Sequence, residues 1–418
     1  MSATPATISA LPPCYPSAPS YSVEPAPDEK RLEFSRRYHS RAQPTGNFVK
    51  RTEDAAVVLL EQDDDAEIPV YGRGASIRGF VTIDQDRELV SEVVVKIKGR
   101  IEAMVSEAGA HRQTILDDSH TLWSSSSSRN SSVCPGAVPF VVTLPTHFKH
   151  YSPTGARDLS LPASYELPNS TVPGLFLRIS YIMQIVVTRV RSQRWNFIAK
   201  KSKLVCVPFK YSPRSQPAAP IHPVSDFFLD IKTMPEEFRQ IVWQLTPRPK
   251  SSVDPLDLQL FLPASGVFAL DDTLPFHVHL SGPRASLRRF APASVSAAAG
   301  DESLAVMLVR QIVYDHHGQR AARTMPIGHA QLSCCPPQPG VAPDGDGSPA
   351  SLDWTGEVRC SEQTQVASFM AGSICAQDFF VVQFRPAGCK TSQLYTTLRF
   401  SLPVRIVTES WMENSWLR

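Results

Sequence analysis

A short proline and tyrosine motif near the start of the chain carries the most specific chemistry in the sequence. Pro12-Pro13-Cys14-Tyr15 has the form PPxY. Two consecutive prolines favour an extended polyproline II helix, their rings fill an aromatic groove, and the tyrosine fills the neighbouring pocket of a WW domain. Through Pro12, Pro13 and Tyr15 the motif predicts a WW-domain partner. The alternative is a chance match in a proline-rich chain.

A degraded copy of this motif follows a few residues later. Pro19-Ser20-Tyr21 keeps one proline and the tyrosine, but Ala18 stands where the first proline of the motif would be. Two linked copies can bind more tightly than one, because the second contact becomes intramolecular. Pro19 and Tyr21 are therefore a candidate second motif that would add avidity, and the alternative is that this degraded copy binds nothing.

Basic residues are concentrated in one stretch of the chain. Between Glu166 and Asp226 there is no acidic residue, and there are nine basic ones. These are Arg178, Arg189, Arg191, Arg194, Lys200, Lys201, Lys203, Lys210 and Arg214. Strand alternation places Arg189 with Arg191 and Lys201 with Lys203 on shared faces.

A second basic group has the same spacing. Lys96, Lys98 and Arg100 alternate with apolar residues and so share one strand face. If these strands are neighbours, the seven residues form one cationic face for phosphorylated or acidic tails of membrane cargo, or for an anionic lipid surface. The seven are Lys96, Lys98, Arg100, Arg189, Arg191, Lys201 and Lys203. The alternative is ordinary solvated strand faces and protected sheet edges.

Patterns typical of enzymes and metal sites are missing from the sequence. There is no GxSxG, no GxxxxGK[ST] and no GxGxxG. The segment 315–318, DHHG, predicts a hairpin turn because Asp and Gly favour turns. None of the eight cysteines has CxxC spacing, and Cys334 and Cys335 are adjacent, which does not suit a zinc site. We therefore predict no catalytic residue, no metal and no cofactor.

Composition narrows the class of protein further. The 418 residues carry a net charge of +2, which argues against nucleic acid as a partner. The 37 prolines argue against long helices and for turns, edge strands and extended segments. Neither a signal peptide nor an apolar stretch long enough to span a bilayer is visible. These features predict a cytoplasmic protein, and the basic residues described above add peripheral recruitment to an anionic membrane surface, that of the plasma membrane or endosomes.

Period-2 patterns of Val, Ile and aromatic residues predict strands in both halves of the chain. The clearest runs are 93–98, 140–144, 175–190, 204–210, 256–262, 273–280, 304–313, 379–384 and 398–407. Segment 238–245 fits a helix or a strand. We predict a strand, because its surroundings are β and Pro247 would stop a helix.

Composition shifts predict where the domains begin and end. Residues 1–55 are predicted to be a disordered tail, and 212–224, with four prolines, a hinge. Two β-sandwich domains are predicted at 56–211 and 225–410, followed by a short end at 411–418. Flexible insertions are predicted at 291–300 and 336–349.

The order of several segments resembles the fungal arrestin-like proteins of the α-arrestin family. In the first half these are VYGRGASIRGFVTI, VVVKIKGRIEA, AVPFVVTLPTHF, LPASYE, VPGLFLRISYIMQIVVTRVR and LVCVPFKYSPRSQPAAPI. In the second half they are LQLFLPASGVFALDDTLPFHVHLSG, SLDWTGEVRC, DFFVVQF and LPVRIVTESW. The resemblance implies two tandem immunoglobulin-like sandwiches, and an adaptor role in which membrane cargo is linked to a ubiquitin ligase.

Two functional hypotheses follow from the motif and the resemblance. In the first, the chain is an adaptor that links membrane cargo to a WW-domain ubiquitin ligase of the HECT type for endocytosis or sorting. In the second, it is a coat or sorting scaffold of arrestin fold that works without ubiquitin, and the PPxY match is incidental.

Overall fold

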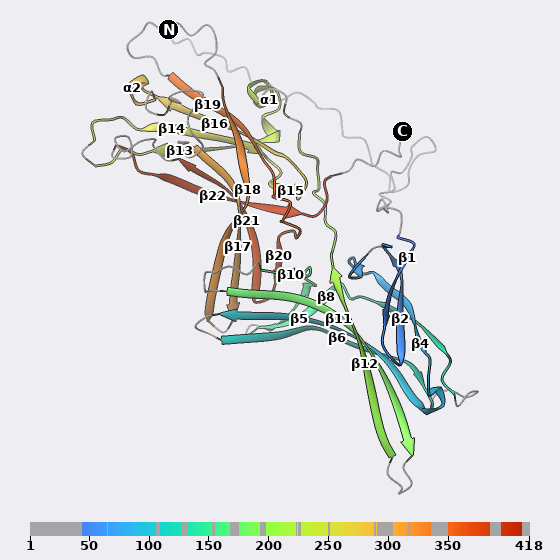
Figure 1. Ribbon diagram of the computed structural model, residues 1–418. Coiled ribbons are helices and arrows are strands. Elements are labelled where there is room, and N and C mark those ends of the chain that lie inside the picture. The colour runs from blue at the N-terminus through green and yellow to red at the C-terminus, as the bar shows by residue number, and fades with distance from the viewer. Residues whose placement is uncertain are drawn as a thin grey trace, which may run out of the picture. The chain divides into compact units, whose positions relative to one another are not determined.

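Nearly all regular structure in the chain is β-strand (Figure 1). In this computed structural model the described residues are 44–64, 66–105, 109–126, 133–152, 155–167, 175–192, 198–222, 224, 227–249, 251–287, 290, 304–316, 318–335, 350–384 and 394–411. Both motifs of the predicted tail and the predicted insertions at 291–300 and 336–349 lie outside these residues. The prediction of an all-β sandwich fold is confirmed.

Two sheets form the N-terminal sandwich. The first has the order β1(Gly46–Arg51), β2(Ala55–Gln62), β4(Ser76–Ile83) and β7(Ala137–Thr143). The second has the order β3(Val70–Tyr71), β12(Ile198–Tyr211), β11(Leu175–Ser192), β5(Val90–Val105) and β6(Gly109–Ser124), with β10(Tyr165–Glu166) paired to β11. A separate two-stranded ribbon consists of β8(His147–Ser152) and β9(Gly155–Ser160).

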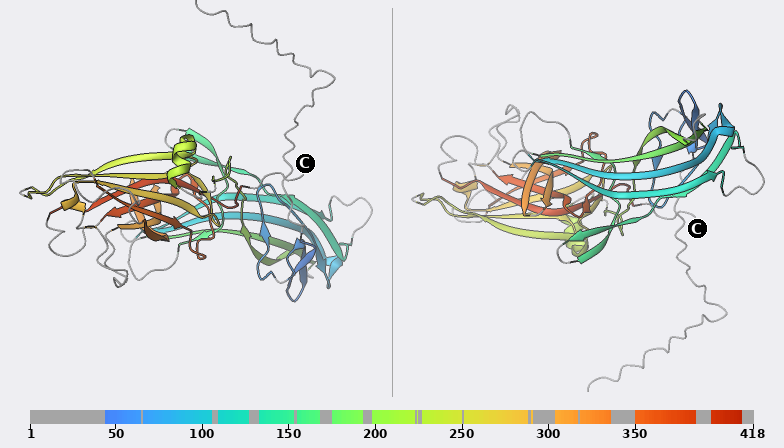
Figure 2. Two further views of the ribbon diagram at one scale, coloured as in Figure 1. Left: turned by 90° about the horizontal axis from the view of Figure 1, so that it is seen from above. Right: turned by 90° about the horizontal axis from the view of Figure 1, so that it is seen from below.

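One continuous sheet forms the C-terminal sandwich. Its order is β13(Phe238–Leu245), β14(Leu256–Pro263), β16(Leu274–Gly282), β19(Ala350–Val358), β18(Gln319–Cys335), β17(Leu304–His316), β21(Ile374–Phe384), β22(Leu398–Val407) and β15(Val267–Ala269), with β20(Phe369–Ala371) on β21. The sheet folds over on itself, since Trp243 of β13 stacks on Phe400 of β22 with ring centroids 3.5 Å apart. Figure 2 shows how strongly the strands of both sandwiches curl.

Alternation along the strands builds the two cores. In β5, Val93, Val95 and Ile97 are fully buried while the residues between them are partly exposed. The core of the C-terminal sandwich is formed in the same way, for example by Leu258 and Leu260 of β14. Burial of these branched and aromatic side chains is the main stabilising contribution to the fold.

The two sandwiches share apolar packing where they meet. The core of the N-terminal sandwich includes residues from three strands of the C-terminal one: Ile312 and Tyr314 of β17, Ala371 of β20, and Ile374 and Ala376 of β21. The junction is therefore a packed interface as well as a chain connection. It is crossed by residues 212–222, which have no regular structure.

Helices among the described residues are short. They are η1(Arg87–Leu89), α1(Phe227–Thr233), η2(Pro235–Glu237) and α2(Arg284–Leu287). No helix in the described part of the chain is long and apolar enough to cross a membrane.

Several sequence predictions can be compared with these elements. Segment 238–245 is strand β13, and the turn at DHHG joins β17 to β18 as a hairpin, both as predicted. The predicted tail of 1–55 is too long, because β1 already begins at Gly46 and pairs with β2. The sequence does not reveal this strand because Phe48 and Val49 are flanked by polar residues, which leaves too short an apolar pattern.

Candidate functional site

The structure divides the predicted cationic face into two groups. The described residues do not include the motif residues Pro12, Pro13, Tyr15, Pro19 and Tyr21. They also leave out the side chain of Arg191. Lys96, Lys98 and Arg100 lie on the outer face of β5, opposite the buried Val95, Ile97 and Ile101. On β6 the cross-strand neighbour of Lys98 is Asp117, and that of Arg100 is Thr114. This outer face carries charges of both signs.

Arg189 lies on the opposite, inner face, so the prediction of one joint face is wrong. In β11 it continues the inward series that includes Ile185 and Val187. Lys201 and Lys203 share the inward side of β12 with Val205. The strands are neighbours as expected, and Arg189 lies directly opposite Lys201 in the register of β11 and β12. The physical reason for the correction is that alternation defines two faces without saying which is inner.

A signal for the correct face is nevertheless present in the sequence. The inner face of β11 carries Tyr181, Ile185 and Arg189. The opposite face carries the polar residues Ser180, Gln184 and Thr188. Polar residues at every fourth position mark the solvent side of a half-buried strand. Arg189 is therefore the exception on an otherwise apolar inner face, and a buried arginine requires a partner.

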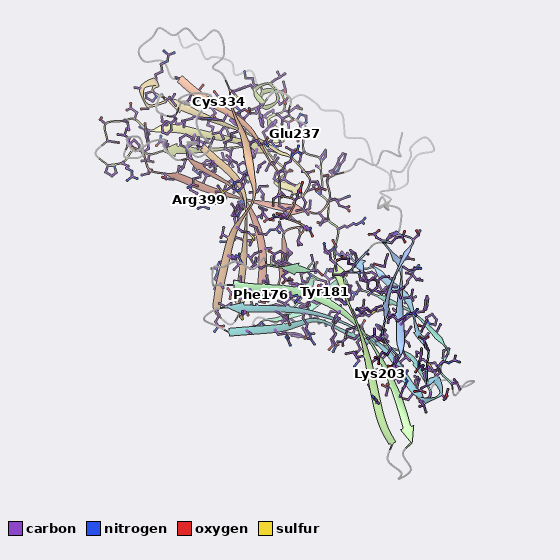
Figure 3. All side chains as sticks on the ribbon, in the orientation of Figure 1. Phe176, Tyr181, Lys203, Glu237, Cys334 and Arg399 are labelled. Carbon is purple, nitrogen blue, oxygen red and sulfur yellow. The ribbon has the colours of Figure 1, made fainter. Side chains whose placement is uncertain are left out.

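Asp54 is that partner, and it lies in the turn between β1 and β2. Its Oδ1 is 3.8 Å from Nη1 of Arg189, and its Oδ2 accepts a hydrogen bond from Nζ of Lys203. Figure 3 shows Lys203 on the long β11–β12 hairpin. The hydrogen bond from Lys203, together with the charges of Lys203, Arg189 and Lys201, lowers the pKa of the Asp54 carboxyl despite its partial burial.

Arg189 is fixed in place but keeps unused hydrogen-bonding capacity. Its side chain is only 9% exposed, and Nη2 donates to the backbone carbonyl of Gln85 over 3.2 Å. Its Nε is buried and has no hydrogen-bond partner among the described residues. A guanidinium has five N–H donors, so this group can donate hydrogen bonds to a further anion.

A cavity of about 280 Å³ opens beside these charges. Its lining includes Asp54, Arg189, Lys203, Thr52 and Glu53. We refer to it as the Arg189 cavity. Sequence reasoning identifies the cations but misses Asp54, because the fold brings the β1–β2 turn to the β11–β12 hairpin from far away in the chain. Two acids, Glu53 and Asp54, also limit the site, since they share the lining with Arg189 and Lys203 and any incoming anion competes with Asp54 for Lys203.

Comparisons with known proteins leave the family open. The chain matches no family model, and no curated protein matches its sequence. The all-β sandwich architecture is consistent with an arrestin-like fold. Sandwich architectures host many unrelated functions, so a functional conclusion has to rest on the residues of the site.

Proposed function

We propose that this protein is an adaptor that links membrane cargo to a WW-domain ubiquitin ligase of the HECT type, for endocytosis or sorting. In this proposal the Arg189 cavity receives an acidic or phosphorylated residue of the cargo tail. The observation that carries it is the unpartnered Nε of a nearly buried arginine at the wall of a cavity. A buried donor without an acceptor is costly, and an incoming anion would satisfy it.

The chemistry of the cavity favours a carboxylate or a phosphate. Arginine presents a planar fork that matches both anions, and Lys203 supplies a second positive charge. The carboxylate of Asp54 already neutralises part of the positive charge of Arg189 and Lys203. A phosphate carries close to two negative charges at neutral pH, so it competes with Asp54 better than a carboxylate does.

The link to the ligase rests on the motif Pro12-Pro13-Cys14-Tyr15 and on the resemblance to α-arrestins. A WW domain needs the prolines and the tyrosine in an extended segment, and the motif supplies all three. The same two-part arrangement would let one molecule hold cargo and ligase together. A coat or sorting scaffold would use the cavity without the motif.

The test uses the full chain and fluorescent peptides of one sequence with Ser, Glu or phosphoserine at a single position. We expect the phosphorylated peptide to bind best, and Arg189→Gln to weaken that binding about tenfold or more. Lys98→Gln on the outer face of β5 is the matched control and should have little effect. Lys203→Gln is a second variant, because its partly exposed side chain can be changed without disturbing the core.

Equal binding of all three peptides, or loss of binding only in Lys98→Gln, would contradict the assignment of the cavity. The ligase part is tested separately by capture of a HECT-type ligase on wild-type and Tyr15→Ala chains. If the ligase is captured equally by both, the scaffold hypothesis is favoured over the adaptor.

A further inference from the structure

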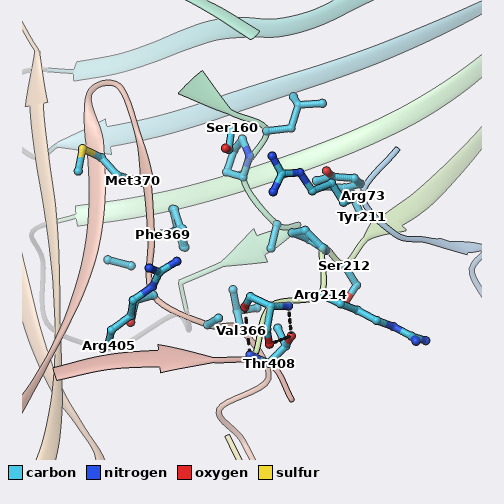
Figure 4. Close-up of a pocket in the computed structure, with 18 of the residues that line it drawn as sticks. Arg73, Ser160, Tyr211, Ser212, Arg214, Val366, Phe369, Met370, Arg405 and Thr408 are labelled. Atoms are coloured by element: carbon cyan, nitrogen blue, oxygen red, sulfur yellow. Dashed lines mark hydrogen bonds between the residues drawn. The ribbon is translucent and has the colours of Figure 1, made fainter. Parts of the chain in front are cut away.

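A pocket of about 700 Å³ lies at the junction of the two sandwiches (Figure 4). We refer to it as the junction pocket. Both sandwiches line it, mainly with residues 158–164, 210–215, 365–370, 375–379 and 403–405. It shares no lining residue with the Arg189 cavity. A cleft of this volume is within the range of specific ligand sites.

Two arginines face this pocket from different sandwiches. Arg73 follows β3 in the N-terminal sandwich, and Arg405 lies in β22 of the C-terminal one. Figure 4 shows both side chains extending toward the middle of the pocket. Both are exposed, and neither has an ion pair with any residue that the structure describes.

Two further cations at the rim are already engaged. Nζ of Lys210 donates to Oε1 of Gln365 over 3.3 Å. Arg214 points away from the pocket in Figure 4, and its Nε is 3.3 Å from Oε1 of Glu409. Lys210 keeps its positive charge because its partner is a neutral amide, whereas Glu409 offsets the charge of Arg214. Arg73 and Arg405 are therefore the groups available to a ligand.

The described acids in the lining do not cancel this charge. Both carboxylate oxygens of Asp378 accept hydrogen bonds, from Arg310 and from Ser368. Asp158 lines the pocket as well. Three cations without an ion pair among the described residues, Arg73, Lys210 and Arg405, therefore share the lining with one acid that is not already bound to a buried partner. The pocket is complementary to a negatively charged ligand.

Apolar side chains of β20 line the same pocket. Phe369 packs against Tyr165 with ring centroids 5.5 Å apart, and Met370 beside it is 64% exposed. An exposed methionine next to an aromatic ring is an adaptable contact for another apolar side chain. The site thus combines separated positive charges with an apolar patch.

We propose that the junction pocket binds an extended acidic peptide segment of a partner protein, with carboxylates at Arg73 and Arg405 and an apolar side chain against Phe369 and Met370. A compact phosphate headgroup would be held by clustered cations, whereas these two come from opposite sides with apolar surface between them. Spaced charges with an apolar anchor fit a peptide. This site is separate from the Arg189 cavity, so the outcome of its test does not depend on whether the proposed function is correct.

Binding at this place has a structural consequence. Because both sandwiches supply lining residues, the bound segment would hold the junction together. A ligand that binds only the folded chain raises its thermal stability. Stabilisation should therefore accompany binding, and both should weaken as salt rises.

The test titrates the full chain with fluorescent peptides of alternating Glu and Leu, of Gln and Leu, and of Glu and Ser. We expect the Glu-Leu peptide to bind best, and the double variant Arg73→Gln with Arg405→Gln to weaken that binding about tenfold. Arg399→Gln is the matched control, because Arg399 is exposed on the same strand β22 and does not line the pocket. Arg189→Gln should also leave this binding unchanged.

Several results would overturn the proposal. One is equal binding of the Glu-Leu and Gln-Leu peptides, and another is equal binding by the double variant and the wild type. If Arg189→Gln abolishes peptide binding and the double variant does not, the peptide occupies the Arg189 cavity instead. If vesicles containing phosphatidylinositol phosphates bind through Arg73 and Arg405 while the peptides do not, the pocket is a headgroup site.

Discussion

Arg310 of β17 and Asp378 of β21 lie directly opposite each other and form a two-pronged ion pair in the interior of the chain. Nε of Arg310 donates to Oδ1 of Asp378 over 2.7 Å, and Nη2 donates to Oδ2 over 2.9 Å. The side chains are 3% and 0% exposed. Nη1 of Arg310 donates to the carbonyl of Val366, and Ser368 donates to Asp378, so every guanidinium nitrogen and both carboxylate oxygens of the pair have a partner.

Removing one member of this pair should be costly. We expect Asp378→Ala to lower the free energy of unfolding by about 3–5 kcal/mol, because it leaves a buried guanidinium without its counter-charge. The measurement is urea unfolding at neutral pH. Replacing both residues, Arg310→Met with Asp378→Leu, should recover most of the loss. A loss below about 1 kcal/mol, which is typical of an exposed pair such as Arg78 and Glu61, would contradict a buried pair.

Asp54 provides a prediction in which stability and binding change in opposite directions. Asp54→Ala removes the acid shared by Arg189 and Lys203, so the chain should become less stable. The same change removes the competitor from the Arg189 cavity, so a phosphorylated peptide should bind more tightly. Thermal unfolding and fluorescence anisotropy on one preparation measure both effects. If binding weakens together with stability, Asp54 helps to build the site instead of competing for it.

The strands that the sequence predicts are those with apolar alternation. β5 and β11 have long runs of Val and Ile, and their burial follows the expected period. β6 and β18 are as long, but they consist largely of polar and small residues, so no period marks them. They form strands because they complete the hydrogen bonding of a neighbouring strand, which is a tertiary cause.

The sites depend even more on tertiary structure. Arg189 could be assigned to the inner face from the polar residues that alternate with it. The approach of Asp54 could not, since no local pattern connects a β1–β2 turn with a distant hairpin. The same holds for Arg73 and Arg405, which lie far apart in the chain and meet only at the junction pocket. Charge patterns identify candidate groups, and the fold decides which of them meet.

The PPxY motif gives a prediction that separates binding from folding. We expect Pro13→Ala or Tyr15→Ala to abolish binding of a WW domain and to leave the melting temperature unchanged, because the core in the described part of the chain begins at Ala55. Binding of an isolated WW-domain fragment and thermal unfolding are the two measurements. Tyr21→Ala is the control and should cause only a small loss, through avidity. Equal capture of the WW domain by wild type and Tyr15→Ala would refute the motif.

Asp353 of β19 lies between two histidines of β16 and gives a prediction about pH. Its Oδ1 is 3.1 Å from Nε2 of His277 and 2.7 Å from Nδ1 of His279, and Ser351 donates to Oδ2 over 3.1 Å. His277 is 1% exposed, and the ring of Phe228 from α1 is 4.8 Å away. Burial alone would raise the pKa of the Asp353 carboxyl. The hydrogen bonds from His277 and His279, with their charge, outweigh burial and hold the pKa well below its usual range.

A lowered pKa in the folded chain means that ionised Asp353 stabilises the fold. The contribution is fully present above the pKa of about 3.9 that an aspartate has in an unfolded chain, and it is lost as the pH falls further toward the folded value. Asp353→Asn should therefore cost about 1–3 kcal/mol at pH 7, and the difference from wild type should shrink in acid. Urea unfolding across a pH series measures this, with the exposed Asp257→Asn as the control. A difference that stays constant from neutral to acid pH would show that the histidines hold Asp353 by packing alone and that its charge contributes nothing.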